Sequence, residues 1–197
     1  MAKAIKAGGI GSDAVKAATG KGWDEWFRII DRAGGRKMDH KQIVAVVSKQ
    51  KGARPWWQQM ITVGYEQARG LRKVGETAKG YQISRSKTVD APLPALFKAW
   101  KDPKARGRWL SLGGAGVPAR QKSDSDLVIR RATANKSLRI TWPDETNIEV
   151  NFYKTPSGKT QVTVQHNKLA DAKTAAKMKA YWGKQLEQLA ALSPTGK

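Results

Sequence analysis

Side chains suited to acid–base or metal chemistry are scarce, because the chain has two histidines and no cysteine. His40 follows Asp39, a residue typical of helix starts, and we expect it to be solvated at the surface. His166 continues the alternation of Val162 and Val164, which predicts an inward position on a strand. There it either satisfies a backbone carbonyl or contacts a ligand. One inward histidine without cysteines or a carboxylate cluster does not make a metal site.

Two short motifs match patterns of binding sites, but the residues around them do not predict the structure that such a site needs. Gly114 to Ala119 match the loose pattern G-x-G-x-x-A, but Pro118 is followed by ARQKSDSD, which predicts no helix to face a pyrophosphate. Asp124 and Asp126 flank serines, and we interpret them as a solvated turn, not a calcium site. Neither G-x-x-x-x-G-K-[ST] nor G-x-S-x-G occurs. We therefore expect no catalytic residue, no metal and no cofactor, and an unrecognised enzyme is the least supported hypothesis.

Charge is the extreme property of the sequence, with 37 basic and 16 acidic residues and a net charge of +21. Such a charge attracts polyanions, and two basic segments could follow phosphate groups. The same residues are equally consistent with solvated faces, because stacking aromatics are not interleaved with them. The candidate nucleic-acid-binding residues are Arg69, Arg72, Lys73, Lys101, Lys104, Arg106 and Arg108.

Length and composition predict a globular protein. Its 197 residues, 40% of them hydrophobic and eight of them tryptophan, suffice for one large or two small domains. No apolar run reaches the roughly 18 residues of a membrane span, and the N-terminus lacks the apolar core of a signal peptide. We expect a cytoplasmic protein without a membrane partner, and the absence of cysteine fits that location.

The first part of the chain predicts a compact helical domain at residues 12–69, after a flexible, glycine-rich tail at residues 1–11. Trp23, Trp26 and Ile30 form one apolar stripe, and Asp39 with Gln42 three residues later forms a capping-box pattern. Pro55 opens the last helix of this domain, and its neighbours Trp56 and Trp57 cannot face the same way. Residues 70–80 lose the apolar period and predict a linker.

The second part, residues 81–193, predicts an α+β fold. The pattern gives a strand at 81–90, two short helices, further antiparallel strands, and a long helix from about Asp171 to Leu192. We expect the sheet to curve around this helix. Each of four side chains lies on the inward phase of its element and is a candidate ligand-binding residue: Trp142, Phe152, His166 and Trp182.

Two segments carry a resemblance to a known family. YQISRSKTVDAPLPALFKAWKDPKARGRWL resembles the opening of START-related, birch-pollen-allergen-like (SRPBCC) helix-grip proteins, in particular the Hsp90 ATPase activator homologues. QVTVQHNKLADAKTAAKMKAYWGKQLEQL is similar to the last strand and long helix of that branch. The first part, from TGKGWDEWFRIIDRAG to WWQQMITVGYEQARG, resembles a bacterial helical domain of unknown function that accompanies such domains.

The resemblance implies a non-catalytic helix-grip module that binds a small apolar molecule or a protein partner. The path between Trp109 and Leu127 is short and glycine-rich, so we expect a cavity that is small or filled by tryptophan. The alternative function is nucleic-acid association through unspecific electrostatics, which the net charge favours.

Overall fold

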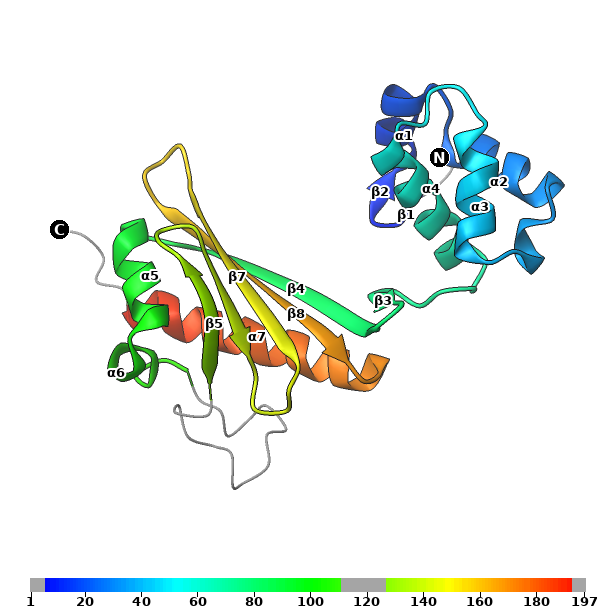
Figure 1. The fold of residues 1–197 in the computed structure, drawn as a ribbon. Helices are drawn as coiled ribbons and strands as arrows, with labels where there is room; N and C mark the ends of the chain where they lie inside the picture. Colours follow the sequence, from blue (N-terminus) through cyan, green and yellow to red (C-terminus); the bar gives the residue numbers. More distant parts are fainter. Residues whose placement is uncertain (1–5, 111–126, 193–197) are drawn as a thin grey trace. The chain divides into compact units, whose positions relative to one another are not determined.

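The computed structural model describes residues 6–110 and 127–192, and the chain divides into two compact units, residues 1–74 and 75–197. Each unit has its own buried hydrophobic core. The boundary falls inside the stretch that the sequence predicts as a linker. Each unit is described by itself (Figure 1).

The described part of the first unit is mainly helical. Its buried core includes Trp23, Trp26, Ile30, Ile43 and Ile61, each fully inaccessible to solvent. Trp56 is 59% exposed whereas Trp57 packs against the core, as expected for adjacent helical residues. The helices are α1 (Ser12–Thr19), α2 (Trp23–Arg32), the short 3₁₀ helix η1 (Gly35–Lys37), α3 (His40–Ser48) and α4 (Pro55–Ala68).

A small hairpin precedes these helices, at residues where the sequence predicts a flexible tail. It consists of β1 (Lys6–Ala7) and β2 (Ile10–Gly11), which pair antiparallel. Gly8 has a φ of +58°, and a Cβ there would lie 3.4 Å from the Cα of Gly64 in α4. The indole N–H of Trp23 donates to the carbonyl of Ile10 at 2.8 Å. The sequence predicts a tail here because local composition does not reveal that Gly8 and Gly64 allow the hairpin to approach α4 closely.

Aspartates cap three helices, and the capping box at Asp39 is the one that the sequence predicts. The Asp39 carboxylate accepts from the Gln42 backbone N–H at 2.8 Å, and the Gln42 side chain completes the capping box. Asp102 accepts from the Ala105 N–H at 2.8 Å, and Asp171 from the Thr174 N–H at 2.7 Å. These hydrogen bonds lower the pKa of the Asp102 and Asp171 carboxyls.

The second unit contains a six-stranded antiparallel sheet among its described residues, in the order β3-β4-β8-β7-β6-β5. Along β8, Thr160, Val162, Val164 and His166 are buried while the residues between them are not, as the period of two predicts. The strands are β3 (Glu76–Thr77), β4 (Gly80–Val89), β5 (Val128–Thr133), β6 (Ser137–Thr141), β7 (Asn147–Lys154) and β8 (Thr160–Leu169).

The long helix α7 (Ala172–Leu192) runs along the sheet, and α5 (Leu93–Lys101) and α6 (Pro103–Arg106) lie near its C-terminal end (Figure 1). The helix buries the stripe that the sequence predicts: Ala175, Met178, Trp182, Leu186 and Leu189. The predicted α+β architecture, a sheet with a long C-terminal helix, is therefore confirmed. No helix in residues 6–110 and 127–192 is long and apolar enough to cross a membrane.

Candidate functional site

A chain of hydrogen bonds, buried at its Trp182 end and exposed at its Asp144 end, links α7 to the sheet at His166. The indole N–H of Trp182 donates to His166 Nδ1 at 3.1 Å, so the neutral imidazole carries its proton on Nε2. Nε2 donates to the Thr146 hydroxyl at 2.6 Å, and this hydroxyl donates to the Asp144 carboxylate. Both ring nitrogens of His166 are therefore occupied by protein groups.

Burial controls the charge of this histidine. His166 is fully inaccessible to solvent, and desolvation lowers its pKa from 6.5 to about 4, against the opposing effect of the Asp144 carboxylate. Burial likewise raises the pKa of the neighbouring Tyr181 hydroxyl far above its ordinary value. At neutral pH His166 is an uncharged, fully bonded group that joins the sheet to α7.

Aromatic rings fill the space between the sheet and α7. The ring centroids of Trp142 and Trp182 are 5.3 Å apart, and Trp100 lies 5.9 Å from Trp182. Of the four predicted ligand-binding residues, the structure brings Trp142, His166 and Trp182 together. The ring of Phe152 instead contacts the ring of Phe97, with their centroids 5.7 Å apart. All four are at most 4% exposed, so they form packed core at this point.

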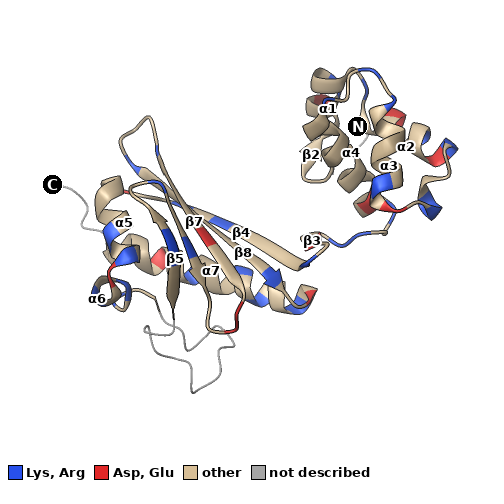
Figure 2. Ribbon diagram, viewed as in Figure 1, with Lys and Arg blue, Asp and Glu red and all other residues tan. Residues whose placement is uncertain are grey.

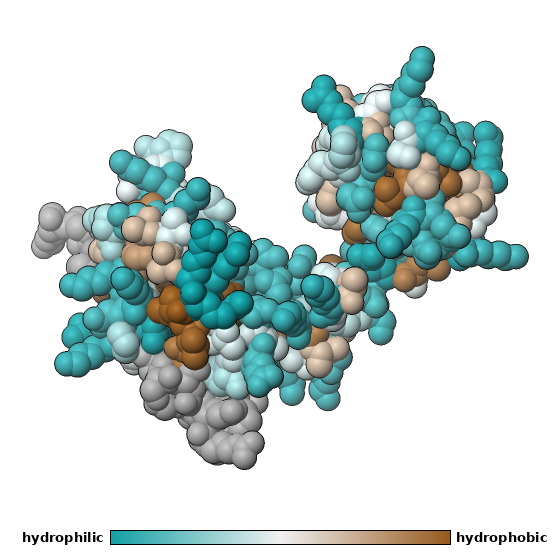
Figure 3. All heavy atoms as spheres, in the orientation of Figure 1, coloured by the Kyte–Doolittle hydropathy of each residue, from teal (hydrophilic) through white to brown (hydrophobic). Residues whose placement is uncertain are grey.

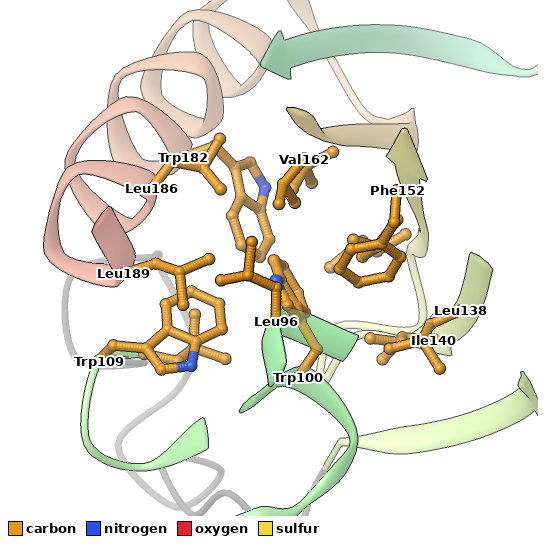
Figure 4. Close-up of a cluster of buried hydrophobic side chains, with 14 of the residues drawn as sticks. Leu96, Trp100, Trp109, Leu138, Ile140, Phe152, Val162, Trp182, Leu186 and Leu189 are labelled. Atoms are coloured by element: carbon orange, nitrogen blue, oxygen red, sulfur yellow. The ribbon is translucent and has the colours of Figure 1, made fainter. Parts of the chain in front are cut away.

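The open apolar space lies at the end of this core. A pocket of about 250 Å³ is lined by α5, α6 and the C-terminal end of α7. Leu96, Trp109 and Leu189 are buried residues of its wall, and Figure 4 shows them pointing toward one another. Arg108 is the charged residue among the described residues that line it. A second hollow shares Arg108, Trp109 and Leu192 with it.

Sequence reasoning did not identify this pocket. The available signal was the spacing of Ala95 and Ala99, which puts two small side chains on the same side of α5 and leaves room beside them. The remaining wall comes from Ala105 and from Leu189, which is remote in the sequence. Only the packing of three helices creates the cavity.

Several predicted phosphate-binding residues make internal contacts. Arg69 is paired with Asp31, lowering the pKa of that carboxyl, and its guanidinium lies 5.1 Å from the Phe27 ring centroid. Arg72 is 2.6 Å from the buried Glu66 carboxylate. These contacts occupy both arginines within the helical unit.

Arg106, a candidate phosphate contact in the sequence, is buried. It is 2% exposed and donates to the Trp100 carbonyl at 2.8 Å, because α6 turns it back onto the end of α5. Lys73, Lys101, Lys104 and Arg108 are exposed. Figure 2 shows basic residues on many elements of both units.

The second histidine also differs from its expected solvated state. His40 Nδ1 lies 2.9 Å from the Glu66 carboxylate and Nε2 lies 2.9 Å from the Gln59 side-chain oxygen. The contact arises because α3 and α4 pack together, which brings Glu66 beside the start of α3. His40 thus provides a hydrogen-bond partner for the buried Glu66 carboxylate.

Within the described residues, no group of three or more His, Cys, Asp or Glu side chains could hold a metal ion. The glycine motif from Gly114 to Ala119 and the pair Asp124 and Asp126 lie outside the described residues.

Comparison with known proteins identifies one family model. Residues 90–193 match the model described as Activator of Hsp90 ATPase homolog 1-like protein. No curated protein matches the chain. The resemblance of the first part to a bacterial helical domain stays a prediction.

Solved structures of low sequence identity are similar to part of this chain. A Staphylococcus saprophyticus protein is 21% identical, with 56% of this chain and 89% of that chain covered and a TM-score of 0.45. CalU16 from Micromonospora echinospora is 17% identical, with 62% and 81% covered and a TM-score of 0.48. The Aha1 dimer from Colwellia psychrerythraea is 16% identical, with 59% and 98% covered and a TM-score of 0.45.

Proposed function

Since residues 90–193 match its model, the chain belongs to the family of Activator of Hsp90 ATPase homolog 1-like proteins, and we propose that it is a non-catalytic module that binds a small apolar molecule. Proteins of this family are typically ligand-binding or protein-binding modules. The observation that carries the proposal is the apolar pocket between α5, α6 and the end of α7.

The size and lining of the pocket define the ligand class. A volume of about 250 Å³ lies below the roughly 300–1,000 Å³ of sites for drug-sized ligands, so the pocket suits a molecule of one or two rings or a short acyl chain. Alanine, leucine and tryptophan side chains in its wall favour apolar surface. Arg108 at the wall supplies one cationic group for a polar end of the ligand.

The packed centre of the unit supports this placement. Trp142, His166 and Trp182 are buried against one another and line neither the apolar pocket nor the hollow beside it. The ligand site predicted at these residues is therefore moved, in this proposal, to the end of the core. The aromatic cluster packs α7 against the sheet through Trp182.

Binding of the neutral two-ring fluorescent probe 6-propionyl-2-(dimethylamino)naphthalene tests the proposal. The unmodified protein should give a saturable rise in fluorescence. Ala95→Phe places a ring in the pocket and should weaken binding at least about tenfold, whereas Ala176→Phe, on an exposed position of α7 outside the pocket, should change it by less than about twofold. Equal binding by both variants would place the probe elsewhere and contradict the proposal.

A protein partner is the other form of binding that the family implies. β5 is the last strand of the described sheet, and Val128 on it is 55% exposed. Figure 3 shows hydrophobic surface over this strand. An edge strand with exposed apolar side chains is suited to pairing with another chain.

Nucleic-acid association is the second candidate function, and the net charge of +21 supports it. Lys73, Lys101, Lys104 and Arg108 are exposed and are its candidate phosphate contacts, whereas Arg106 is buried. The salt dependence of duplex binding tests this candidate.

A further inference from the structure

A basic groove lies along the flank of α7, apart from the apolar pocket. On β4, Arg85 and Lys87 pair in register with Val164 and Val162 of β8, whose side chains are buried beneath α7. Side chains opposite each other in neighbouring strands lie on the same face of the sheet. Two basic residues therefore occupy helix-facing positions at which the next strand has valines.

Gly183 makes room for one of these side chains. It lies in the interior of α7, where glycine destabilises a helix relative to alanine. A Cβ at this position would lie 3.1 Å from a terminal guanidinium nitrogen of Arg85 and 3.5 Å from its Nε. The missing side chain thus allows the guanidinium to lie against the helix backbone.

Hydrogen bonds hold the two basic side chains in place. Arg85 Nε donates to the backbone carbonyl of Lys179 at 3.2 Å, which uses one of the five N–H donors of its guanidinium. Lys87 Nζ donates to both carboxylate oxygens of Glu187, at 2.8 and 2.6 Å. Arg85 is oriented by an uncharged group, whereas Lys87 is neutralised by its partner.

The residues that line the space beside Arg85 and Lys87 carry a net positive charge, which favours an anion. A groove of about 410 Å³ is lined by Arg85, Lys87, Gly183, Lys184 and Glu187, among others. Its described lining contains three basic side chains and one acidic side chain, an excess of two positive charges. A dianion would balance this excess, and the planar fork of a guanidinium matches two oxygens of such a group.

We propose that the groove between β4 and α7 binds a phosphate group, with Arg85 as the principal contact and Lys184 as the second cation. Gly183 leaves room for the guanidinium against the helix, and Arg85 lines the groove from there. The site is independent of the apolar pocket, because Ala180, Gly183, Lys184 and Glu187 share a side of α7 that excludes Leu189.

A titration of the full chain with inorganic phosphate, followed by nuclear magnetic resonance, tests this site. Sodium chloride is adjusted to keep the ionic strength constant, so that general screening does not change. The Arg85 Nε–H and the Gly183 and Lys184 amide signals should shift with one saturable curve. Shifts that never saturate, or that occur only at other basic residues, would overturn the proposal without any variant.

Matched variants give the second readout. Arg85→Gln should weaken phosphate binding at least about tenfold, and Gly183→Leu should do the same by filling the groove. Arg139→Gln is the control, because Arg139 is paired with Glu149 outside the groove and its loss should change binding by less than about twofold. Equal weakening by Arg139→Gln would show that the effect is only that of net charge.

Two further ligands distinguish the chemistry. Methyl phosphate should bind within about threefold of inorganic phosphate if a phosphate group on a larger molecule is the natural ligand, and acetate should bind at least about tenfold more weakly. Acetate binding as tight as phosphate binding would contradict recognition of a dianion. Rejection of methyl phosphate would contradict a phosphorylated ligand.

Discussion

Trp182 on α7 donates its indole N–H to Nδ1 of His166 on β8 at 3.1 Å, inside the hydrophobic core. Around this hydrogen bond, apolar side chains of α7 and β8 belong to the same buried core. A buried donor and a buried acceptor satisfy each other there, so neither retains an unmet desolvation cost. The pair fixes the rotation of α7 over the sheet.

Replacing Trp182 tests how much of the stability depends on this contact. Trp182→Ala removes a fully buried ring and should cost about 3–5 kcal/mol. Trp182→Phe should cost about 1–3 kcal/mol more than Trp142→Phe, because only the first change leaves His166 Nδ1 without a donor. The Trp142 indole N–H has no acceptor among the described residues and makes Trp142→Phe a matched control. Urea midpoints give the free energies, and equal losses for the two phenylalanine variants would contradict this role.

The depressed pKa of His166 predicts a loss of stability in weak acid. The unfolded chain binds a proton near pH 6.5 and the folded chain near pH 4, so the unfolded state gains protons first as the pH falls. Stability contributed by this group is complete above pH 6.5 and should fall by about 2 kcal/mol between pH 7 and pH 5. His166→Gln retains polar atoms but does not titrate, so its urea midpoint should fall less over this range. Parallel curves for the two proteins would refute the assignment.

Helix caps test the division into two units. Asp39→Ala removes a cap in the first unit and should destabilise it by about 1 kcal/mol, roughly a fivefold increase in its unfolded fraction. Hydrogen exchange should then accelerate in residues 12–68 and stay unchanged in residues 75–192. Asp171→Ala, which removes the cap of α7, should give the reverse pattern. Acceleration of both units by either variant would mean that they unfold together.

The sequence predicts the elements of this fold well because the core imposes clear periods. Val162 and Val164 on β8 and Trp182 and Leu189 on α7 are all buried, as their spacing of two or of three and four requires. The capping side chains of Asp39 and Asp171 also act locally, so their hydrogen bonds can be inferred without tertiary structure.

Contacts between remote elements could not be predicted in this way. The burial of Arg106 depends on a four-residue helix, which is too short for a period to indicate which side faces inward. Arg85 looks like a solvated residue in the sequence, and only its contact with Gly183, almost a hundred residues later, gives it a position. The apolar pocket likewise requires Leu189 to meet Ala95 and Trp109.

Duplex binding should be electrostatic and without sequence preference. The logarithm of the binding constant should fall linearly with the logarithm of the salt concentration, with a slope of about 0.9 per phosphate contacted. Lys104→Gln should lower this slope by about 1 if the exposed lysine contacts a phosphate. A fluorescent duplex titrated at several salt concentrations, with and without a scrambled competitor, provides the measurement. Tight, sequence-selective binding at physiological salt would make nucleic-acid recognition the primary function.

The most direct measurement of the apolar site is a methyl nuclear magnetic resonance titration of the full chain with indole, a small apolar probe. Leu96 and Leu189 have methyl groups in the pocket wall, whereas Val150 and Val164 lie in the packed sheet of the same unit. We predict saturable shifts for the two leucines, much smaller shifts for the two valines, and loss of the leucine shifts in Ala95→Phe. Larger shifts at Val150 and Val164, or leucine shifts that persist in Ala95→Phe, would contradict a binding site between α5, α6 and α7.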